Sequence, residues 1–453
     1  MQHLRNLLLA AFLFGASLAL SGCGDNGSYY VPVCSDCGVG TYQFNGTVSG
    51  LASGTSIVLG DTSGVTTTLS ANGSFSYQTS VNSGSAAPLI GVLVQPSAQN
   101  CTVNNGTPDA NGNISVAIAC SALATSPPPV LLTLLAGSLN AGSADGAGLN
   151  ASFNGPSALA VDPSGNVYVA DTLNNTIRKI DTSGNVTTLA GAAGVTGSSD
   201  GTGAAALFNQ PGAVATDGAG NVYVADSGNN TIRMITPAGV VTTLAGSAGV
   251  SGSNDGTGSA ALFSFPEGIA VNSAGTAIYV SDFNNSTIRL VTPAGVVTTI
   301  AGTAGSLGSA DGTGAAAQFN GPQGIALNAS GNIIVADSNN NTIRQVTPAG
   351  VVTTIAGTAG VAGAADGAGT AATFDFPVDV FVASTGMIYV ADSGNDLVRQ
   401  IDTSYNVTSP IGTAEQDVFS AGLLPGSLQS PTSVAGFGAN LYVTTINGVA
   451  MVN

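Results

Sequence analysis

The sequence predicts an all-β protein built from repeated sheets, and three observations lead to this prediction. Only 7% of the 453 residues are charged while 44% are apolar, which is too hydrophobic for a disordered chain. No apolar run beyond the N-terminus approaches the ~20 residues that a membrane-spanning helix needs. From residue 131 onward the chain repeats itself with a period of about 55 residues. One phase of the repeat is marked by five aspartates, which are Asp171, Asp226, Asp282, Asp337 and Asp392.

Each repeat contains four strand signals in a fixed order. In the first repeat these are an apolar run after proline (156–162), NVYVAD (166–171), TIRKI (176–180) and NVTTLAG (185–191). Four antiparallel strands repeated radially make the blade of a β-propeller. The prolines that open the first strands predict six blades, and they are Pro156, Pro211, Pro266, Pro322, Pro377 and Pro431.

The sixth repeat ends after three strands, but its missing fourth strand is present elsewhere. LLTLLAG (131–137) has the sequence of a last strand, although it precedes the first repeat. We therefore expect residues 132–136 to pair with residues 449–452 and to close a ring that spans residues 131–453. Closure removes exposed sheet edges. It should also bury four leucines of the N-terminal strand, which are Leu131, Leu132, Leu134 and Leu135.

The repeat motifs resemble those of NHL repeats. The similarity rests on the proline-led first strand, the hairpin NVYVADSGNNTIR (221–233) and the short last strand. It covers residues 131–453 and implies a six-bladed NHL-type β-propeller.

The N-terminus has the features of an export signal. Residues 1–22 contain Arg5 and then an apolar stretch. The sequence LSGC (20–23) resembles the lipobox of bacterial lipoproteins, which implies cleavage before Cys23 and lipidation of that cysteine. An ordinary signal peptide followed by an incidental cysteine is the alternative. Gly24 in place of Asp favours the outer membrane, so we expect a lipid-anchored protein of the cell envelope, facing either the periplasm or the exterior.

Two segments and a small module separate this anchor from the repeats. Residues 23–40 are predicted to be a flexible leader, and residues 122–130, which include three consecutive prolines, a stiff linker. Between them, residues 41–121 alternate in the manner of strands and resemble a small Ig-like or carboxypeptidase-regulatory-like β-sandwich. A spacer role is the default expectation for this module.

Four cysteines remain after Cys23, and an even number in an exported chain suggests disulfides. We favour the pairs Cys101–Cys120 and Cys34–Cys37, with the other pairings left open. A Cys-X-X-Cys sequence can also be a redox site, but this one has no βαβ context.

Two sets of aspartates and one set of arginines recur in the repeats. Loops between blades and turns between the second and third strands lie at the same end of a sheet, so both aspartate sets should form one acidic rim. The unrepeated Glu267 should stand near the mouth of the central channel. The candidate rim comprises Asp145, Asp171, Asp200, Asp226, Asp255, Asp282, Asp311, Asp337, Asp366, Asp392 and Glu267.

We expect each arginine to pair with the aspartate of its own hairpin and to fix the turn, which leaves one surplus negative charge per blade. These structural arginines are Arg178, Arg233, Arg289, Arg344 and Arg399. A purely structural role for the repeated residues is a strong alternative, because Asp and Asn before glycine are ordinary turn residues. Each inter-blade loop also ends in a phenylalanine that should pack between blades, namely Phe153, Phe208, Phe263, Phe319 and Phe374.

Charge and composition restrict the function. Without residues 1–22 the chain has 24 acidic residues against 6 basic ones (7 less Arg5), a net charge of −18, which disfavours nucleic acid as a partner. The only histidine, His3, lies in the segment expected to be removed, so the histidine-bound zinc of NHL-type lyases has no ligands here.

The sequence therefore predicts a non-enzymatic binding or scaffolding protein of the cell envelope. A monomeric propeller, without a cofactor, would present its acidic rim to a protein or glycan and would contact the membrane only through its lipid anchor. The alternative is a calcium-dependent, lactonase-like hydrolase with carboxylate ligands at the channel mouth. A bound calcium ion is left open, because carboxylate and carbonyl oxygens are the ligands that calcium takes. No segment, however, matches the D-x-[DN]-x-[DN]-G calcium loop.

Overall fold

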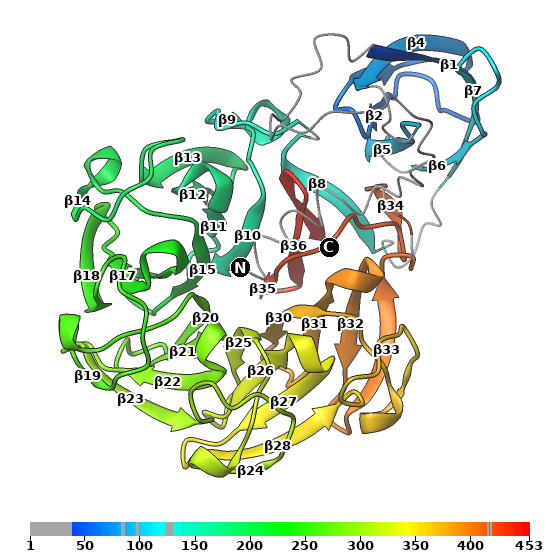
Figure 1. The fold of residues 1–453 in the computed structure, drawn as a ribbon. Helices are drawn as coiled ribbons and strands as arrows, with labels where there is room; N and C mark the ends of the chain where they lie inside the picture. Colours follow the sequence, from blue (N-terminus) through cyan, green and yellow to red (C-terminus); the bar gives the residue numbers. More distant parts are fainter. Residues whose placement is uncertain are drawn as a thin grey trace, which may run out of the picture. The chain divides into compact units, whose positions relative to one another are not determined.

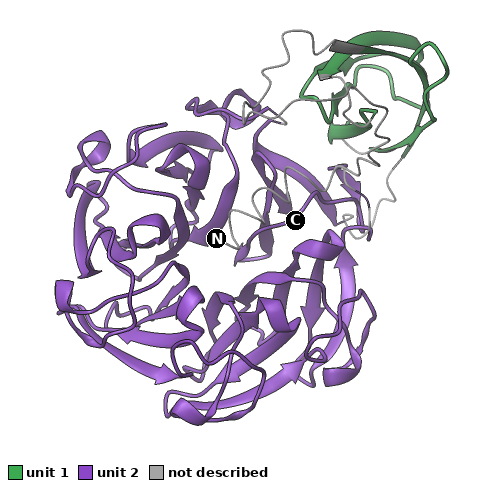
Figure 2. Ribbon diagram, in the orientation of Figure 1, with its two compact units in different colours: residues 1–123 green, residues 124–453 purple. Residues whose placement is uncertain are grey.

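The computed structural model describes residues 39–82, 87–96, 99–122, 130–138, 140–414, 416 and 419–453. The chain forms two compact units, residues 1–123 and 124–453 (Figure 2). The expected signal peptide, Cys23, the Cys34–Cys37 pair and most of the predicted linker lie outside the described residues. Within the described residues, no helix has the length and apolar character needed to cross a membrane.

The first unit consists of two β-sheets. The four-stranded sheet has the order β4 (Gly73–Asn82), β1 (Val39–Ser49), β7 (Asn113–Ala122) and β6 (Gln99–Asn105). The three-stranded sheet has the order β3 (Thr66–Leu69), β2 (Ile57–Asp61) and β5 (Ile90–Val94). Strands β1 and β7 are parallel, whereas the other pairs are antiparallel. Alternate residues of β7, namely Ile114, Val116 and Ile118, are buried in the core as the sequence pattern predicts.

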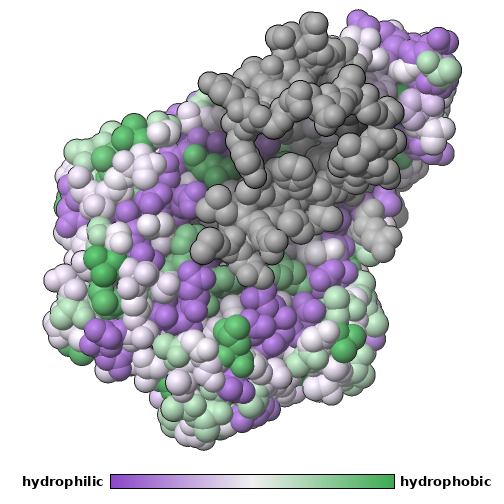
Figure 3. Space-filling model, viewed as in Figure 1, coloured by the Kyte–Doolittle hydropathy of each residue, from purple (hydrophilic) through white to green (hydrophobic). Residues whose placement is uncertain are grey.

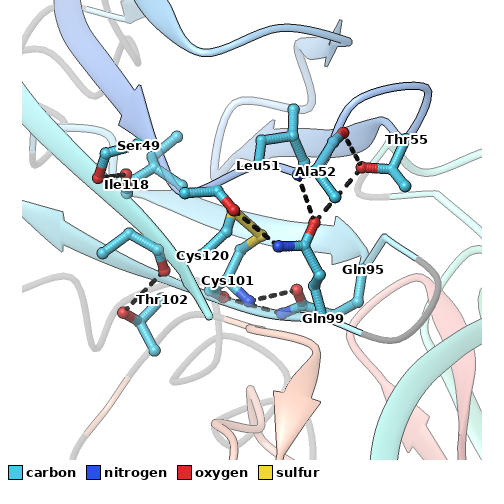
Figure 4. The surroundings of a disulfide bond; sticks show 12 residues. Ser49, Leu51, Ala52, Thr55, Gln95, Gln99, Cys101, Thr102, Ile118 and Cys120 are labelled. Carbon is cyan, nitrogen blue, oxygen red and sulfur yellow. Dashed lines mark hydrogen bonds between the residues drawn. A yellow bond between two sulfur atoms is a disulfide. The ribbon is translucent and has the colours of Figure 1, made fainter. Parts of the chain in front are cut away.

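A disulfide joins Cys101 of β6 to Cys120 of β7, as the sequence predicts (Figure 4). The two cysteines are direct partners in the antiparallel register of these strands. The side chain of Gln95 accepts a hydrogen bond from the amide of Cys101 at 2.7 Å and donates one to its carbonyl at 2.9 Å. Gln99 accepts from the amide of Ala52 at 2.7 Å, so two glutamines hold the backbone around the disulfide.

The second unit is all-β and consists of repeated five-stranded sheets, arranged like those of a β-propeller (Figure 1). Six such sheets occur in its described residues. The first contains β10 (Pro156–Val161), β11 (Val167–Asp171), β12 (Thr176–Ile180) and β13 (Asn185–Ala190) in consecutive antiparallel order, with β9 (Gly146–Ala147) at the outer edge. The fifth strand corrects the predicted four, because a two-residue strand is too short to produce an alternating pattern.

The next four sheets repeat this order from the innermost to the outermost strand. The second contains β15 (Pro211–Thr216), β16 (Val222–Asp226), β17 (Thr231–Ile235), β18 (Val240–Gly246) and β14 (Gly201–Thr202). The third contains β20 (Pro266–Val271), β21 (Ile278–Asp282), β22 (Thr287–Val291), β23 (Val296–Ala301) and β19 (Gly256–Thr257). The fourth contains β25 (Pro322–Leu327), β26 (Ile333–Asp337), β27 (Thr342–Val346), β28 (Val351–Ala356) and β24 (Gly312–Thr313). The fifth contains β30 (Pro377–Val382), β31 (Ile388–Asp392), β32 (Leu397–Ile401), β33 (Asn406–Ile411) and β29 (Gly367–Ala368).

Short 3-10 helices follow two strands of each of these five sheets. Those after the outermost two-residue strands are η1 (Gly148–Asn150), η3 (Gly203–Ala205), η5 (Gly258–Ala260), η7 (Gly314–Ala316) and η9 (Gly369–Ala371). Those after the second strands are η2 (Thr172–Asn174), η4 (Ser227–Asn229), η6 (Phe283–Asn285), η8 (Ser338–Asn340) and η10 (Ser393–Asn395).

The sixth sheet combines segments from opposite ends of the second unit. It contains β35 (Val434–Phe437), β36 (Asn440–Thr445), β37 (Gly448–Val452), β8 (Leu131–Gly137) and β34 (Gly422–Leu423). Strands β37 and β8 are antiparallel, and Val449 lies opposite Ala136. The predicted pairing of residues 132–136 with residues 449–452 is confirmed.

The innermost strands contact one another in the order β10, β15, β20, β25, β30, β35 and again β10. Hydroxyl groups connect several of these neighbours. Thr216 donates to the carbonyl of Val161 at 2.9 Å, and Thr432 donates to the carbonyl of Pro156 at 2.8 Å. The five loop phenylalanines, from Phe153 to Phe374, are fully buried, in agreement with their predicted packing role.

Candidate functional site

The repeated charged residues meet in one cluster per sheet, and the second sheet shows its geometry. Arg233, in the middle of β17, is fully buried. Its Nη1 donates to Asp226 Oδ2 at 2.8 Å, and its Nη2 donates to Asp200 Oδ1 at 2.7 Å. The same two nitrogens also donate to the carbonyls of Leu207 and Ser199. One guanidinium therefore connects two carboxylates with the inter-sheet loop.

Asp226, the residue that ends β16, is the inner carboxylate of this cluster. Besides Arg233, it accepts hydrogen bonds from the side chain of Asn229 at 2.7 Å and from the amide of Asn209 at 2.8 Å. Burial raises the pKa of Asp226 to about 6, although these hydrogen bonds and the charge of Arg233 act to lower it. The carboxylate is thus mainly ionised at neutral pH and balances the buried arginine. The ring of Phe208 lies below the guanidinium, with its centroid 5.2 Å from the central carbon.

Asp200 is the outer carboxylate, and its side chain is 49% exposed. The hydroxyl of Thr243, on the outer strand β18, donates to it at 2.9 Å, and the amide of Thr243 at 3.2 Å. Partial burial raises the pKa of Asp200, but the hydrogen bonds from Arg233 and Thr243 outweigh this effect and hold the pKa below its usual range. Asp200 therefore carries its negative charge at the protein surface.

The same cluster occurs in the first five sheets. Its members are Asp145, Asp171 and Arg178; Asp200, Asp226 and Arg233; Asp255, Asp282 and Arg289; Asp311, Asp337 and Arg344; and Asp366, Asp392 and Arg399. All ten ion pairs are between 2.7 and 2.9 Å long. The structure thus brings the two predicted aspartate sets together in pairs around the predicted arginines.

This geometry corrects the expected rim of ten carboxylates. The inner aspartates Asp171, Asp226, Asp282, Asp337 and Asp392 have no exposed surface. The turn after the second strand folds over them, and its asparagine, the arginine and a loop amide occupy their oxygens. Each arginine also binds an aspartate from the preceding loop rather than only that of its own hairpin. Five outer carboxylates, each about half-exposed, remain at the surface, and we call them the outer aspartates: Asp145, Asp200, Asp255, Asp311 and Asp366.

The sixth sheet replaces the whole cluster with uncharged residues. Ala450 lies opposite Val443 in the register where Arg178 lies opposite Val169 in the first sheet. Thr445 stands at the place of the inner aspartate, and Ala421, before the glycine that starts β34, stands at that of the outer aspartate. The charged residues are therefore present or absent as a set, which matches the high cost of leaving a buried charge without its partner.

Glu267 lies on the innermost strand β20 and is partly exposed. Its Oε2 would be 3.4 Å from a Cβ atom built on Gly212 of β15, so its carboxylate reaches toward the second sheet. Glu267 thus lies on the innermost strand of the third sheet, and its place near the mouth of a central channel stays a prediction. Within the part of the chain that the structure describes, no group of three or more His, Cys, Asp or Glu residues is placed to hold a metal ion.

Asp379, on the innermost strand β30, makes contacts that the sequence pattern did not predict. Its Oδ2 accepts a hydrogen bond from the hydroxyl of Ser433 at 2.5 Å and one from the amide of Val434 at 3.1 Å. Comparison of the repeats with one another shows one unusual feature of Asp379, which is its charge at this position. The corresponding residues of the other first strands are small and uncharged: Ala158, Ala213, Gly268, Gly324 and Ser433.

Comparison with known proteins relates the chain to proteins with NHL repeats. The NHL repeat model matches residues 319–346, and the model for an SMP-30/Gluconolactonase/LRE-like region matches residues 38–246. Protein SUPPRESSOR OF QUENCHING 1, chloroplastic, from Arabidopsis thaliana is 32% identical over 290 residues, which are 60% of this chain and 27% of that protein. NHL repeat-containing protein 2 from Bos taurus is 27% identical over 326 residues, 64% of this chain and 45% of that protein. The chain thus spans less than half the length of either relative.

Solved structures agree on the fold. A structural genomics protein of unknown function from Bacteroides thetaiotaomicron has a TM-score of 0.57 at 16% identity, covering 88% of this chain and 90% of that one. An auxiliary nutrient binding protein from Bacteroides ovatus has a TM-score of 0.55 at 14% identity, with the same coverage. The fold and the repeated clusters therefore define a protein of the β-propeller class. Within that class, the repeat model and the relatives support an NHL-repeat family.

Proposed function

We propose that the protein is a non-enzymatic binding or scaffolding protein of the bacterial cell envelope. In this proposal Cys23 carries a lipid anchor, an Ig-like first unit acts as a spacer, and a six-bladed NHL-type propeller presents the outer aspartates to a protein or glycan partner. The observation that carries the proposal is the repetition of a half-exposed carboxylate at one position of five consecutive sheets.

The charge of the clusters favours a cationic partner. Each cluster contains two carboxylates and one guanidinium, so each retains one negative charge near an outer aspartate. Hydrogen bonds from the arginine and from the outer strand, where Thr243 is the example, already occupy the outer carboxylates. These carboxylates therefore suit long-range attraction of basic groups better than stripping water from a metal ion.

The loops that carry the outer aspartates also expose apolar side chains. Val195, Val250, Leu307 and Val361 are between 45% and 59% exposed, in the loops that precede four of the sheets. One face of the second unit likewise shows small hydrophobic patches separated by hydrophilic residues (Figure 3). We infer that the partner surface combines basic groups with apolar ones.

The proposal predicts a binding defect that depends on where charge is removed. In a crosslinked pull-down from intact cells, Asp200→Asn with Asp255→Asn should reduce recovery of the bound partner about tenfold, because steering charge is lost. The control pair is Asp181→Asn with Asp402→Asn, which removes two carboxylates from turns between third and fourth strands, at the opposite end of the sheets. Equal recovery with both pairs, at unchanged thermal stability, would contradict the proposal.

A calcium-dependent, lactonase-like hydrolase is the second candidate, and the match to the SMP-30/Gluconolactonase/LRE-like model favours it. A lactone-hydrolysis assay on the purified protein, with calcium and with a chelator, separates the two functions. The binding proposal expects no hydrolysis above background in either condition. Calcium-dependent turnover that Glu267→Gln abolishes would replace the binding proposal with the hydrolase.

A further inference from the structure

The edge of β37 is completed by a strand from the other end of the second unit, and in Figure 1 this strand, β8, lies beside the red C-terminal strands. Strands β8 and β37 are antiparallel, with Thr133 opposite Met451. The hydroxyl of Thr133 donates to the carbonyl of Met451 at 3.2 Å, and the amide of Leu131 donates to the carbonyl of Asn453 at 3.1 Å. Because β8 does not follow β37 along the chain, every copy of the protein carries a separate segment that fits this edge.

The place that β8 occupies is specific for its sequence. Leu132 and Ala136 are fully buried, and Leu134 is 9% exposed. Gly137 has a φ of +96°, and a Cβ atom built on it would lie 2.7 Å from the carbonyl oxygen of Asn447. A strand that completes the sheet must therefore have apolar residues at alternate positions and end in glycine.

The sixth sheet lacks the charged cluster that ties each of the other five sheets to the loop before it. Its five strands contain no charged residue. In the first sheet, by contrast, Arg178 donates to the carbonyl of Ala144 at 2.9 Å and to Asp145 at 2.7 Å, and Asn174 donates to the carbonyl of Gly142 at 2.7 Å. Strand β8 is held instead by backbone bonds, its single hydroxyl group and apolar packing. We therefore expect the sixth sheet to open before the other five.

Movement of β8 would leave the first sheet intact. The contacts of Asn174 and Arg178 fix the chain to the first sheet from Gly142 onward, so the pivot lies between Gly137 and Gly142. In the sixth sheet of a second copy, β8 would make the same bonds to β37 and β34 and would bury the same side chains. Exchange of an identical segment between copies is a low-cost route to a dimer.

We propose that the edge of β37 in one copy binds β8 of a second copy, which gives a strand-exchanged dimer in equilibrium with the monomer. Each copy then completes the sixth sheet of the other, in a two-fold symmetric arrangement. The uncharged sixth sheet suits this contact, because the net charge of −17 opposes association of two copies through their charged surfaces.

Disulfide trapping between two chains tests the exchange. One full-length chain carries Thr133→Cys, and a second, isotopically labelled chain carries Met451→Cys; both positions are partly exposed. After the chains are incubated together in detergent and oxidised, mass spectrometry should find residue 133 of the unlabelled chain linked to residue 451 of the labelled chain. The control chains carry Lys179→Cys and Thr187→Cys, which are opposite each other on β12 and β13. A short turn joins these two strands, so the control should give no linkage between chains.

A chain with both Thr133→Cys and Met451→Cys provides a second test. Oxidation at low concentration should link the two cysteines within one chain and hold β8 in its own sheet. This locked chain should stay monomeric by light scattering at concentrations at which the wild type forms dimers. Native mass spectrometry of labelled and unlabelled wild-type chains, which needs no substitution, should show mixed dimers.

Three results would each overturn the proposal. The first is linkage of residues 133 and 451 between chains that is no more frequent than linkage in the control. The second is dimer formation by the locked chain to the same extent as by the wild type, which would place the interface elsewhere. The third is the absence of mixed dimers of the wild type.

Discussion

Deletion of residues 131–136 should prevent the second unit from folding, with loss of its cooperative thermal transition. These residues form most of β8, which lies between β37 and β34 in the sixth sheet. Without them β37 becomes an exposed edge, and an unpaired edge invites aggregation. Burial of Leu132 and Leu134 is also lost, at about 1.5–3 kcal/mol for each side chain. Calorimetry and circular dichroism of the purified variant would measure the transition.

The matched control is a chain that starts at residue 130 and lacks the first unit, and it should keep the transition of the second unit. A deletion variant that unfolds at the wild-type temperature would contradict the role assigned to β8.

The structure also corrects the prediction that all four leucines of residues 131–136 are buried. Leu131 and Leu135 are partly exposed, because alternate residues of β8 point to opposite faces of the sheet.

Substitution of a single cluster arginine is expected to be the most damaging point mutation in the second unit. Arg233→Ala would leave the fully buried Asp226 without its counterion, and it would also remove the contact with Asp200. Breaking a buried ion pair by removal of one partner costs about 3–5 kcal/mol. Denaturant-induced unfolding at pH 7 would measure the loss as a shift in the transition midpoint.

The sixth sheet suggests the matched control for this substitution. The triple variant Asp200→Ala, Asp226→Thr and Arg233→Ala copies the residues found there, which are Ala421, Thr445 and Ala450. Because it removes the buried charges together, we expect the triple variant to lose clearly less stability than Arg233→Ala alone. A triple variant at least as unstable as the single one would show that the aspartates contribute apart from their pairing with the arginine.

The repeats made the main strands of the second unit predictable, because each strand has its own signal and the signals recur at a fixed spacing. The pairing of β8 with β37 was predictable for the same reason, since residues 131–137 have the sequence of a last strand. The cluster that surrounds each inner aspartate was not predictable, because it includes a contact between the arginine and an outer aspartate. Asp200 and Arg233 are 33 residues apart, and only the path of the inter-sheet loop brings them together.

The contacts of Asp379 show a second limit of the repeat pattern. Repetition reveals what the sheets share, whereas Ser433 and Asp379 are 54 residues apart and meet at one junction only. A charged residue at a position otherwise occupied by small residues signals a difference, but it does not identify the partner. The partner follows from which innermost strands are neighbours in space.

The sixth sheet also requires that the two ends of the second unit come together. The first five sheets each form from one continuous stretch of chain, whereas Thr133 bonds to Met451 across 318 residues. Loop-closure entropy for such a separation is on the order of 5 kcal/mol before any contact offsets it. Until both ends of the second unit have come together, the sixth sheet is incomplete and the facing sides of the first and fifth sheets stay uncovered. We expect the protein to be most exposed to proteases and to association with other copies of itself while these edges are unpaired.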